Sequence, residues 1–353
     1  MPKARLPAEW EPQAGVMLTW PHEDTDWGDR LPVVYPAFAA IGSAISAHEI
    51  LLSVCQSTAH AARVRQLLRE RGAAVDRLRF CIAPSDDSWA RDHGPLTTVA
   101  GGRALLNDFI FNGWGGKFAG ARDSAISGTL QAQRVFPATE MHRREFVLEG
   151  GAIETDGAGT LLARRSSVIT DTRNPGLRQA DVERLLGDYL GFDRFLWLDH
   201  GDVSGDDTDG HIDTLARFAA PDTIVYATAP ANDTDHPGLD AMEGQLRGLR
   251  TRSGSPYRLL PLPFPGVHLD RDGRRLPATY ANFLLINDAV LLPTYAVAED
   301  AEAIAVLSGA FPGRDVIPVD CRDIIEQNGS LHCLTMQFPA QVELRDSLEF
   351  TTA

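Results

Sequence analysis

The sequence predicts an α/β fold in which one supersecondary unit, two strands followed by a helix and a further strand, recurs along the chain. Three observations support this prediction. Apolar runs of strand length alternate with helix-like segments through the 353 residues. Short turn signals join neighbouring strands into hairpins. Polar residues stand at the heads of the units at similar intervals, a pattern typical of stacked or radially arranged units.

Helical periodicity and helix end signals mark six segments. Ser57 and Thr58 offer caps before the second segment, and Pro237 precedes the fifth. Gly72 and Gly191 follow the second and fourth segments, where many helices end in left-handed backbone. The predicted helices span residues 36–48, 59–71, 123–135, 179–190, 239–250 and 300–310.

Four hairpins are expected between these helices, because pairs of apolar runs are separated by short turns of Gly, Asp, Asn or Pro. The clearest turn is Asp156-Gly157-Ala158-Gly159. The paired runs are 96–99 with 104–109, 151–153 with 160–163, 212–218 with 223–227, and 280–286 with 289–295.

The polar heads of the units recur every 53 to 69 residues and comprise Asp92, Glu149, His211, Tyr280 and Cys333. Radial closure of the units would bring these residues to one central axis and would remove exposed sheet edges. The alternative is an ordinary α/β protein whose elements only look periodic, because the units share little sequence identity.

The charge balance restricts the class of partner. The chain has 33 Lys plus Arg against 48 Asp plus Glu, a net charge of −15. This balance argues against a nucleic-acid footprint, which needs clustered basic residues, and against a surface that seeks anionic lipid. An acidic field favours the approach of a cationic small substrate. A content of 44% hydrophobic and 23% charged residues is typical of a globular chain.

The cysteines and the N-terminal sequence favour a cytoplasmic protein. Cys55, Cys81, Cys321 and Cys333 show no C-x-x-C spacing, so neither a disulfide scaffold nor a zinc ribbon is expected. No apolar leader follows residues 1–7, and no run approaches the ~20 apolar residues of a membrane helix. Cys55, Cys81 and Cys321 lie in apolar settings typical of small buried side chains.

Two carboxylates stand in unusual settings. Asp92 lies within Trp89-Ala90-Arg91-Asp92-His93-Gly94-Pro95, and Glu149 lies directly before Gly150-Gly151. Each has a structural interpretation, an ion pair with Arg91 at a strand start for Asp92 and turn chemistry for Glu149. Burial would raise the pKa of Glu149 and make it usable as a general acid or base.

The acid-rich stretch 205–213 invites a metal interpretation, but the pattern of an EF-hand calcium loop is not present. There is also no His-Glu-x-x-His zinc motif. His211 and Asp213 lie two residues apart, so in a strand they would face the same side and line one pocket wall. A calcium-binding loop at 206–213 remains a non-catalytic alternative.

Cys333 follows the turn Asn328-Gly329-Ser330 and begins an apolar run, so it can lie exposed at a strand edge. A single such cysteine, with histidine and acids elsewhere in the chain, is typical of a thiol nucleophile. The alternative is a small buried hydrophobic residue. His332 would face the opposite side of the strand and is interpreted as structural.

Taken in order, these motifs resemble the agmatine deiminase branch of the guanidino-modifying (pentein) superfamily, which also contains the bacterial peptidylarginine deiminases. The resemblance implies a five-bladed α/β propeller with pseudo-fivefold symmetry, one catalytic domain over residues 1–353, and neither metal nor organic cofactor. Closed propellers often pair through exposed helices, so a homo-oligomer is one expectation. The matching segments are 7–13, 20–22, 89–95, 111–117, 148–151, 207–213 and 332–333.

The resemblance also implies roles for individual residues. Asp92 and Asp213 would hold a planar guanidinium by charge-assisted hydrogen bonds. Cys333, as thiolate, would attack the central guanidino carbon. His211 would protonate the departing ammonia and then activate water, while Glu149 would orient both the guanidinium and His211.

Two further residues complete the expected substrate site. Trp114 would pack against the aliphatic stem of the substrate, with core packing as an equal alternative, and Asn112 would shape its loop. The stretch 327–333 departs from the family's usual Gly-Gly-Gly-Asn-Ile-His-Cys, which leaves the recognition of the substrate tail open.

The leading hypothesis is hydrolysis of agmatine to N-carbamoylputrescine and ammonia, in a polyamine pathway that leads to putrescine. A deiminase of peptidyl or free arginine, or of another guanidino compound, is an alternative. A catalytically inactive propeller that binds a partner is a third class. If the free enzyme holds Cys333 as a thiol, turnover should rise toward alkaline pH.

Overall fold

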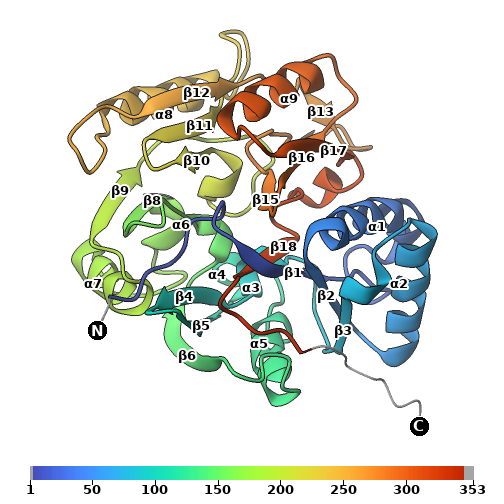
Figure 1. Ribbon diagram of the computed structural model, residues 1–353. Helices are drawn as coiled ribbons and strands as arrows, with labels where there is room; N and C mark the ends of the chain where they lie inside the picture. Colours follow the sequence, from blue (N-terminus) through green and yellow to red (C-terminus); the bar gives the residue numbers. More distant parts are fainter. Residues whose placement is uncertain (1–2, 346–353) are drawn as a thin grey trace.

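The computed structural model of the protein describes residues 3–345, and in them five sheets of three or four strands lie around a common centre (Figure 1). Four of the sheets share one construction. A hairpin of two antiparallel strands is followed by a helix, after which a third strand pairs in parallel with the second. Each sheet is thus the unit of two strands, helix and strand that the sequence predicts.

These four units follow one another along the chain. Their elements are β4 (Leu96–Ala100), β5 (Arg103–Ile110), α5 (Asp123–Ala132) and β6 (Glu140–Val147); β7 (Ile153–Thr155), β8 (Thr160–Arg164), α7 (Gln179–Leu190) and β9 (Arg194–Leu198); β10 (Ala216–Ala220), β11 (Thr223–Ala227), α8 (His236–Gly248) and β12 (Arg258–Leu262); β15 (Leu284–Ile286), β16 (Ala289–Thr294), α9 (Glu299–Ala310) and β17 (Asp315–Asp320).

The fifth sheet joins segments from the two ends of the described chain. Its strand order is β18-β1-β2-β3, with β18 antiparallel to β1 and the other pairs parallel. Met17 of β1 pairs with Met336 of β18, which fixes the register. The elements are β1 (Gln13–Thr19), α1 (Leu31–His48), β2 (Ile50–Cys55), α2 (Thr58–Glu70), β3 (Leu78–Ile82) and β18 (Thr335–Pro339).

Shorter elements fill the connections between the sheets. They are the helices α3 (Ala90–His93), α4 (Gly113–Gly116) and α6 (Arg165–Val168), the 3₁₀ turns η1 (Gly28–Arg30), η2 (Val75–Arg77), η3 (Gly150–Ala152), η4 (Ile212–Thr214) and η5 (Ile325–Gln327), and the two-stranded sheet of β13 (His268–Leu269) and β14 (Arg275–Leu276).

The six predicted helices are all present, and the bounds of α7 match the prediction. The predicted start of α1 at Pro36 is wrong, because Pro32 occupies the first turn and Pro36 lies inside the helix. The predicted strand over 212–218 is also wrong at its beginning. Ile212–Thr214 is a 3₁₀ turn, and β10 starts at Ala216.

Helix α1 concerns the expectation that no segment of the chain is long and apolar enough to cross a membrane. Within residues 3–345, the helical stretch Gly28–His48 is the one long and apolar enough to cross a membrane by length and composition. Its Val34, Phe38, Ile41 and Ile45 are fully buried against the core. The core helix of a folded domain meets the same criterion.

A buried ionic network lies at the centre, between the sheets. The guanidinium of Arg217 on β10 is fully buried and binds the carboxylates of Glu9 and Glu154. Its Nη1 also donates to the backbone oxygen of Phe283, 2.8 Å away. Because a buried charge is costly unless paired, this network ties the N-terminal segment to three sheets and fixes the heads of their first strands.

Candidate active site

Short connections just before the first strand of each sheet carry the candidate site residues. Asp92 lies in α3 before β4, and Glu149 lies directly before η3 and β7. His211 and Asp213 belong to the turn around η4 before β10, while Cys333 precedes β18. Because these heads converge on the centre of the fold, residues far apart in sequence meet there.

Glycine after Glu149 allows this close approach. A Cβ atom at Gly151 would lie 2.6 Å from Nδ1 of His211 and 2.9 Å from Oδ1 of Asp92. The Gly151 backbone N–H instead donates to Oδ1 of Asp92 over 3.0 Å. The Gly-Gly pair therefore places the backbone of η3 against the two side chains, which a larger residue would push apart.

The thiol of Cys333 is 5% exposed and has two polar neighbours. Nδ2 of Asn282 donates to Sγ over 3.2 Å, and Sγ lies 3.7 Å from Oδ2 of Asp213. Burial, together with the negative charges of Asp213 and Asp92, raises the pKa of Cys333 well above its usual value. The acidic surroundings therefore favour the thiol form of Cys333, and a bound cation would help to ionise it.

Asp213 is fully buried, and its two oxygens differ. Oδ2 lies 2.7 Å from Nδ1 of His332, whereas Oδ1 has no hydrogen-bond partner among the described residues. Burial alone would raise the pKa of Asp213, but the hydrogen bond and charge of His332 and the charge of His211 lower it. Asp213 is therefore an ionised carboxylate with one oxygen free for a ligand.

Asp92 is held by two donors. Its Oδ1 accepts from Gly151, and its Oδ2 accepts from Nε1 of Trp114 over 2.9 Å. Burial raises the pKa of Asp92 to about 6, and the nearby Asp213 and Glu149 add to this effect while His211 opposes it. A cation bound between Asp92 and Asp213 would relieve the repulsion between them.

His211 lies between carboxylates without a short hydrogen bond to either. Its Nδ1 is 3.6 Å from Oδ1 of Asp92, and its Nε2 is 3.9 Å from Oε2 of Glu149. Burial lowers the pKa of His211, but Asp92, Glu149 and Asp213 outweigh burial and raise it to about 9. The imidazole therefore carries a proton at neutral pH, ready to be donated to a leaving group.

Glu149 is fully buried and paired with a residue that the sequence did not indicate. Nε of Arg173 lies 2.9 and 2.8 Å from its two oxygens, and Nη1 of Arg173 reaches Oδ2 of Asp209 over 2.8 Å. Burial would raise the pKa of Glu149, but the nearby His211 imidazole and the Arg173 guanidinium lower it. Glu149 is thus an ionised partner for His211.

A pocket of about 420 Å³, measured with its open mouth, leads to Cys333 and Asp92. Trp89, Trp114 and Phe118 supply apolar walls, and a Cβ atom at Gly329 would lie 2.2 Å from the Trp89 ring. The remaining lining residues are polar or acidic: Asp26, Asp87, Asp207, Thr208, Gln327 and Asn328. Within residues 3–345, neither Lys nor Arg lines this pocket.

Of the sequence-predicted residues, Cys333, His211, Glu149, Asp92 and Asp213 meet at this site. Trp114 also lines the pocket, while its ring packs edge-to-face on Phe111 at 4.9 Å. Trp114 thus belongs both to the pocket wall and to an aromatic cluster, and its contact with a substrate stem stays a prediction. Its backbone adopts left-handed angles (φ 54°), which the loop must enforce.

Asn112 lies away from the pocket lining and shapes the Trp114 loop. Its Oδ1 accepts from the backbone N–H of Gly115 over 2.8 Å, and its Nδ2 donates to the backbone oxygen of Thr172. The side chain therefore acts as a cap for α4.

Two expectations about local geometry are wrong. His211 and Asp213 do not share a strand face, because they lie in a tight turn around η4. His332 does not face away from the site, because β18 begins only at Thr335 and the turn before it directs His332 onto Asp213.

The regular spacing of the head residues predicts Tyr280 at the centre of the site, but the structure places Asn282 there instead. Its Oδ1 accepts from the backbone N–H of His332 and Cys333, and its Nδ2 reaches Sγ of Cys333. The hydroxyl of Tyr280 instead donates to Asp300. Only the regular spacing pointed to this segment, since a neutral Asn in an apolar run carries no other signal.

The carboxylates of Asp206, Asp207 and Asp209 in the acid-rich loop 206–213 bind other groups of the protein. Asp206 accepts hydrogen bonds from the backbone of Thr208 and Gly210, and Asp207 accepts from Nδ2 of Asn328. Asp209 binds Lys117 and Arg173. In residues 3–345 no group of three or more acidic, His or Cys side chains is arranged to hold a metal ion.

Cys55, Cys81 and Cys321 are buried, as expected. Burial raises the pKa of Cys81 and of Cys321 to about 12, and it raises the pKa of Cys55 well above its usual value. All four cysteines are free thiols. Cys333 differs from the other three because it lines a pocket beside acidic and imidazole groups.

A family model of the Porphyromonas-type peptidyl-arginine deiminases matches residues 5–339. The chain belongs to this family. The match spans all five sheets and every head residue described above, so the site belongs to the part of the chain that defines the family.

Individual relatives cover nearly the full chain. Agmatine deiminase from Stutzerimonas stutzeri is 34% identical, with 95% of each chain covered. A crystal structure of a candidate arginine deiminase from Porphyromonas gingivalis is 47% identical, covers 97% of this chain and 100% of its own, and has a TM-score of 0.91. A cysteine-to-serine variant of agmatine deiminase from C. jejuni with substrate bound is 31% identical, covers 96% and 97%, and has a TM-score of 0.88.

Proposed function

We propose that the protein is an agmatine deiminase that hydrolyses agmatine to N-carbamoylputrescine and ammonia. The observation that carries this proposal is the arrangement of one buried thiol between two carboxylates, with a protonated histidine beside them. Within residues 3–345, Oδ1 of Asp213 and both ring nitrogens of His211 have no hydrogen-bond partner, which supports a polar ligand that completes the site. Curated relatives about a third identical to the chain are agmatine deiminases.

Binding begins with the guanidinium. This group is planar and permanently charged, so two carboxylates can take it out of water without leaving a charge unpaired. Asp213 offers its free Oδ1, and Asp92 offers its remaining lone pairs from a carboxylate already positioned by Trp114 and Gly151. The bound cation opposes the negative charges that keep Cys333 protonated, so binding favours the thiolate.

Attack of the Cys333 thiolate on the central guanidino carbon forms a C–S bond. The C–N bond to one terminal nitrogen then breaks, and that nitrogen leaves as ammonia with a proton from His211. The product of this half-reaction is a covalent S-linked amidine. Glu149, ionised and fixed by Arg173, keeps the imidazole directed at the leaving nitrogen.

Hydrolysis completes the cycle. His211, now neutral, takes a proton from water, and the oxygen of that water attacks the amidine carbon. The C–S bond then breaks, the remaining hydroxyl proton passes to the departing sulfur as the C=O bond forms, and the ureido product leaves with Cys333 restored as a thiol. Each turnover consumes one water and releases one ammonia, and this chain's own side chains supply every proton transfer.

The lining of the pocket favours agmatine over arginine. The side chains that line the pocket are more exposed toward its mouth. Cys333 and Asp92 are buried, Asp87 and Asp207 are half-buried, and Asp26 is exposed. The tail of a substrate whose guanidinium is held inside therefore passes three carboxylates. The ammonium of agmatine would be attracted there, while the carboxylate of free arginine would be repelled.

The five similar sheets around one centre support the proposal of a five-bladed α/β propeller that forms a single catalytic domain. In this arrangement each blade contributes one head segment to the site. Four free cysteines and an acidic surface suit the reducing cytoplasm. The proposed chemistry requires no cofactor, because a thiol and an acid–base pair supply each step.

Ammonia release by the purified protein on agmatine, free arginine and a blocked arginine peptide tests the proposal. We expect turnover of agmatine that is lost in Cys333→Ala and unchanged in Cys321→Ala, the matched control. Turnover of an arginine substrate in preference to agmatine would retain the Cys333 chemistry and overturn the assigned substrate. Equal activity of Cys333→Ala and the unmodified protein would overturn the mechanism.

A further inference from the structure

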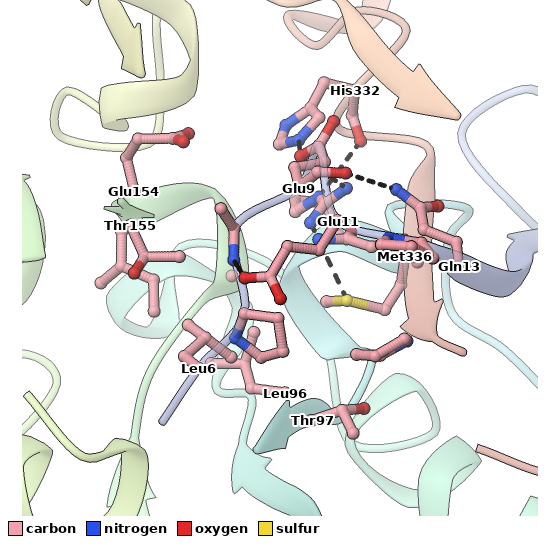
Figure 2. A pocket seen from close by; sticks show the side chains of 18 residues that line it. Leu6, Glu9, Glu11, Gln13, Leu96, Thr97, Glu154, Thr155, His332 and Met336 are labelled. Atoms are coloured by element: carbon pink, nitrogen blue, oxygen red, sulfur yellow. Dashed lines mark hydrogen bonds and ion pairs between the residues drawn. The ribbon is translucent and has the colours of Figure 1, made fainter. Parts of the chain in front are cut away.

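His332 connects the candidate site to a second pocket. Its Nδ1 lies 2.7 Å from Oδ2 of Asp213, and its Nε2 lies 2.8 Å from Oε2 of Glu9. The ring is 2% exposed. Figure 2 shows His332 and Glu9 joined at the wall of the second pocket, which shares no lining residue with the pocket that leads to Cys333.

Both carboxylates that flank the ring are ionised. Burial would raise the pKa of Glu9, but the charges of Arg217, His332 and Arg91 lower it far below its usual value. Asp213 has a lowered pKa for the same kind of reason. An ionised carboxylate only accepts hydrogen bonds, so each ring nitrogen of His332 must donate one.

We propose that His332 is a positioning residue: an imidazolium held between Glu9 and Asp213 that keeps Asp213 ionised and leaves its second oxygen free for the substrate. The assignment rests on the proposed function, in which Asp213 holds the guanidinium. A ring that donates from both nitrogens cannot accept a further proton, so His332 acts by charge and by orientation rather than as a relay.

The environment of Asp213 explains why a fixed cation is needed. Its carboxylate is fully buried near that of Asp92, and the thiol of Cys333 lies 3.7 Å away. Burial and the charge of Asp92 favour a neutral Asp213, which could not pair with a guanidinium. His211 and Arg217 also oppose this effect, but His332 provides the direct hydrogen bond.

Two guanidinium groups hold Glu9 in its place beside His332. Glu9 accepts from Nη2 of Arg217 over 2.8 Å, and Nη2 of Arg91 lies 3.9 Å away. Nε of Arg91 also contacts the backbone oxygen of His332, 3.5 Å away. The ring is thus held at two points, by the N-terminal segment and the turn around η4, and α3 holds the backbone of the same residue, so His332 orients Asp213 without direct contact with a substrate.

Nitrogen-15 NMR of histidine-labelled Cys333→Ala, without substrate, tests the charge directly. We expect both ring nitrogens of His332 to give signals of protonated nitrogen at pH 7.5. The signals are assigned from a His332→Asn spectrum, and the exposed His200 serves as the reference ring. A neutral tautomer at His332 would overturn the proposal, and this result does not depend on the identity of the substrate.

Two substitutions separate charge from shape. His332→Asn can reproduce the donor at Nδ1, and His332→Gln can reproduce the donor at Nε2, but neither new side chain carries a charge. Agmatine binding to Cys333→Ala, measured by calorimetry between pH 5.5 and 8.5, then reports on Asp213. We expect both variants to bind about ten-fold more weakly at pH 6, one pKa unit at Asp213, with a smaller loss at pH 8.5.

The controls make each outcome decisive. His200→Asn in the same background should bind agmatine as the parent does at every pH. A His332→Asn variant with parent affinity at pH 6 would overturn the electrostatic role. If both variants lose the same amount of agmatine affinity at pH 6 and at pH 8.5, the electrostatic role is also contradicted, because His332 would then act only through its shape and packing. If the Cys333→Ala parent fails to bind agmatine, the proposed function fails, while the NMR result still decides the charge on His332.

Discussion

The side-chain amide of Asn282 contacts Cys333 at two points. Its Nδ2 lies 3.2 Å from Sγ of Cys333, and its Oδ1 accepts a hydrogen bond from the backbone N–H of Cys333. One neutral side chain thus fixes the position of Cys333 and places a donor against its sulfur. A donor in this position stabilises a thiolate more than a thiol.

Replacing Asn282 by Asp keeps the acceptor and removes the donor. We expect kcat/KM to fall about 100-fold, because a hydrogen bond to a charged group contributes about 1.5–3 kcal/mol and a second carboxylate would repel the thiolate. The pH at which Cys333 reacts with iodoacetamide should rise. Asn287→Asp, at a backbone-capping amide outside the site, is the control. Alkylation at an unchanged pH would contradict this role.

The pH dependence of kcat/KM should have two limbs. Activity rises with pH because Cys333, whose pKa lies well above its usual value, must lose a proton. Activity falls above pH about 9, because His211 has a pKa raised to about 9 and must carry a proton for ammonia to leave. Steady-state rates from pH 6 to 10.5 check this, with thermal melts at each pH to confirm folding. A rate that still climbs at pH 10.5 would be inconsistent with His211 as the acid.

Asp87 is expected to select the cationic tail. It lines the pocket of Cys333, accepts from Nε1 of Trp27 and of Trp89, and has a pKa that burial raises to about 7. Asp87→Asn should raise KM for agmatine about ten-fold, roughly 1.4 kcal/mol, since one ion pair is lost. KM for n-butylguanidine, which lacks only the ammonium, should change less than about two-fold.

The exposed Asp29 provides the matched control for this test, since Asp29→Asn also removes one negative charge from the surface. Equal effects of Asp87→Asn on the two guanidines would exclude tail recognition. An effect of Asp29→Asn as large as that of Asp87→Asn would assign the selectivity to the overall field of the protein.

Glu49, at the end of α1, should make stability depend on pH. Its carboxylate is 5% exposed, and burial raises its pKa to about 7 from about 4.5 in the unfolded chain. The folded state therefore binds the proton more tightly, so this contribution to stability is complete below pH about 4.5 and is lost as pH rises through about 7.

Glu49→Gln should accordingly raise the free energy of unfolding at pH 8 by on the order of 2 kcal/mol and have little effect at pH 5. Urea unfolding at both pH values measures the difference. Glu70→Gln on the exposed face of α2 is the control. The same effect at pH 5 and pH 8 would show that packing, rather than ionisation, is what changed.

The repeated unit could be predicted from sequence because its signals are local. Hairpin turns and helix ends depend on neighbouring residues, which is why α7 was placed correctly. The start of α1 required a choice between Pro32 and Pro36, and only packing against the core decides that. The turn at Ile212–Thr214 was mistaken for a strand, because an apolar run does not distinguish extended backbone from a tight 3₁₀ turn.

The site was predictable only in part for a different reason. Charged side chains before glycines, and a cysteine after a turn, are visible as motifs. Asn282, Arg173 and Glu9 act through partners 51, 24 and 323 residues away, so no local pattern records their function. The position of His332 depended on where β18 begins, a boundary that the sequence leaves uncertain by a few residues.

The pairing of β18 with β1 has a consequence for biosynthesis. Translation produces Glu9 and β1 before the rest of the described fold, while Cys333 and β18 follow the other four sheets. A nascent chain can therefore assemble the three heads that carry carboxylate and imidazole groups, together with the head that carries Asn282, while the edge of β1 still lacks its partner and the thiol is absent. The proposed nucleophile is present only once the segment that leads into β18, the last strand of residues 3–345, has been synthesised. A transcript cut short before Cys333 would yield a chain that lacks this thiol and has an unpaired edge at β1, which favours aggregation.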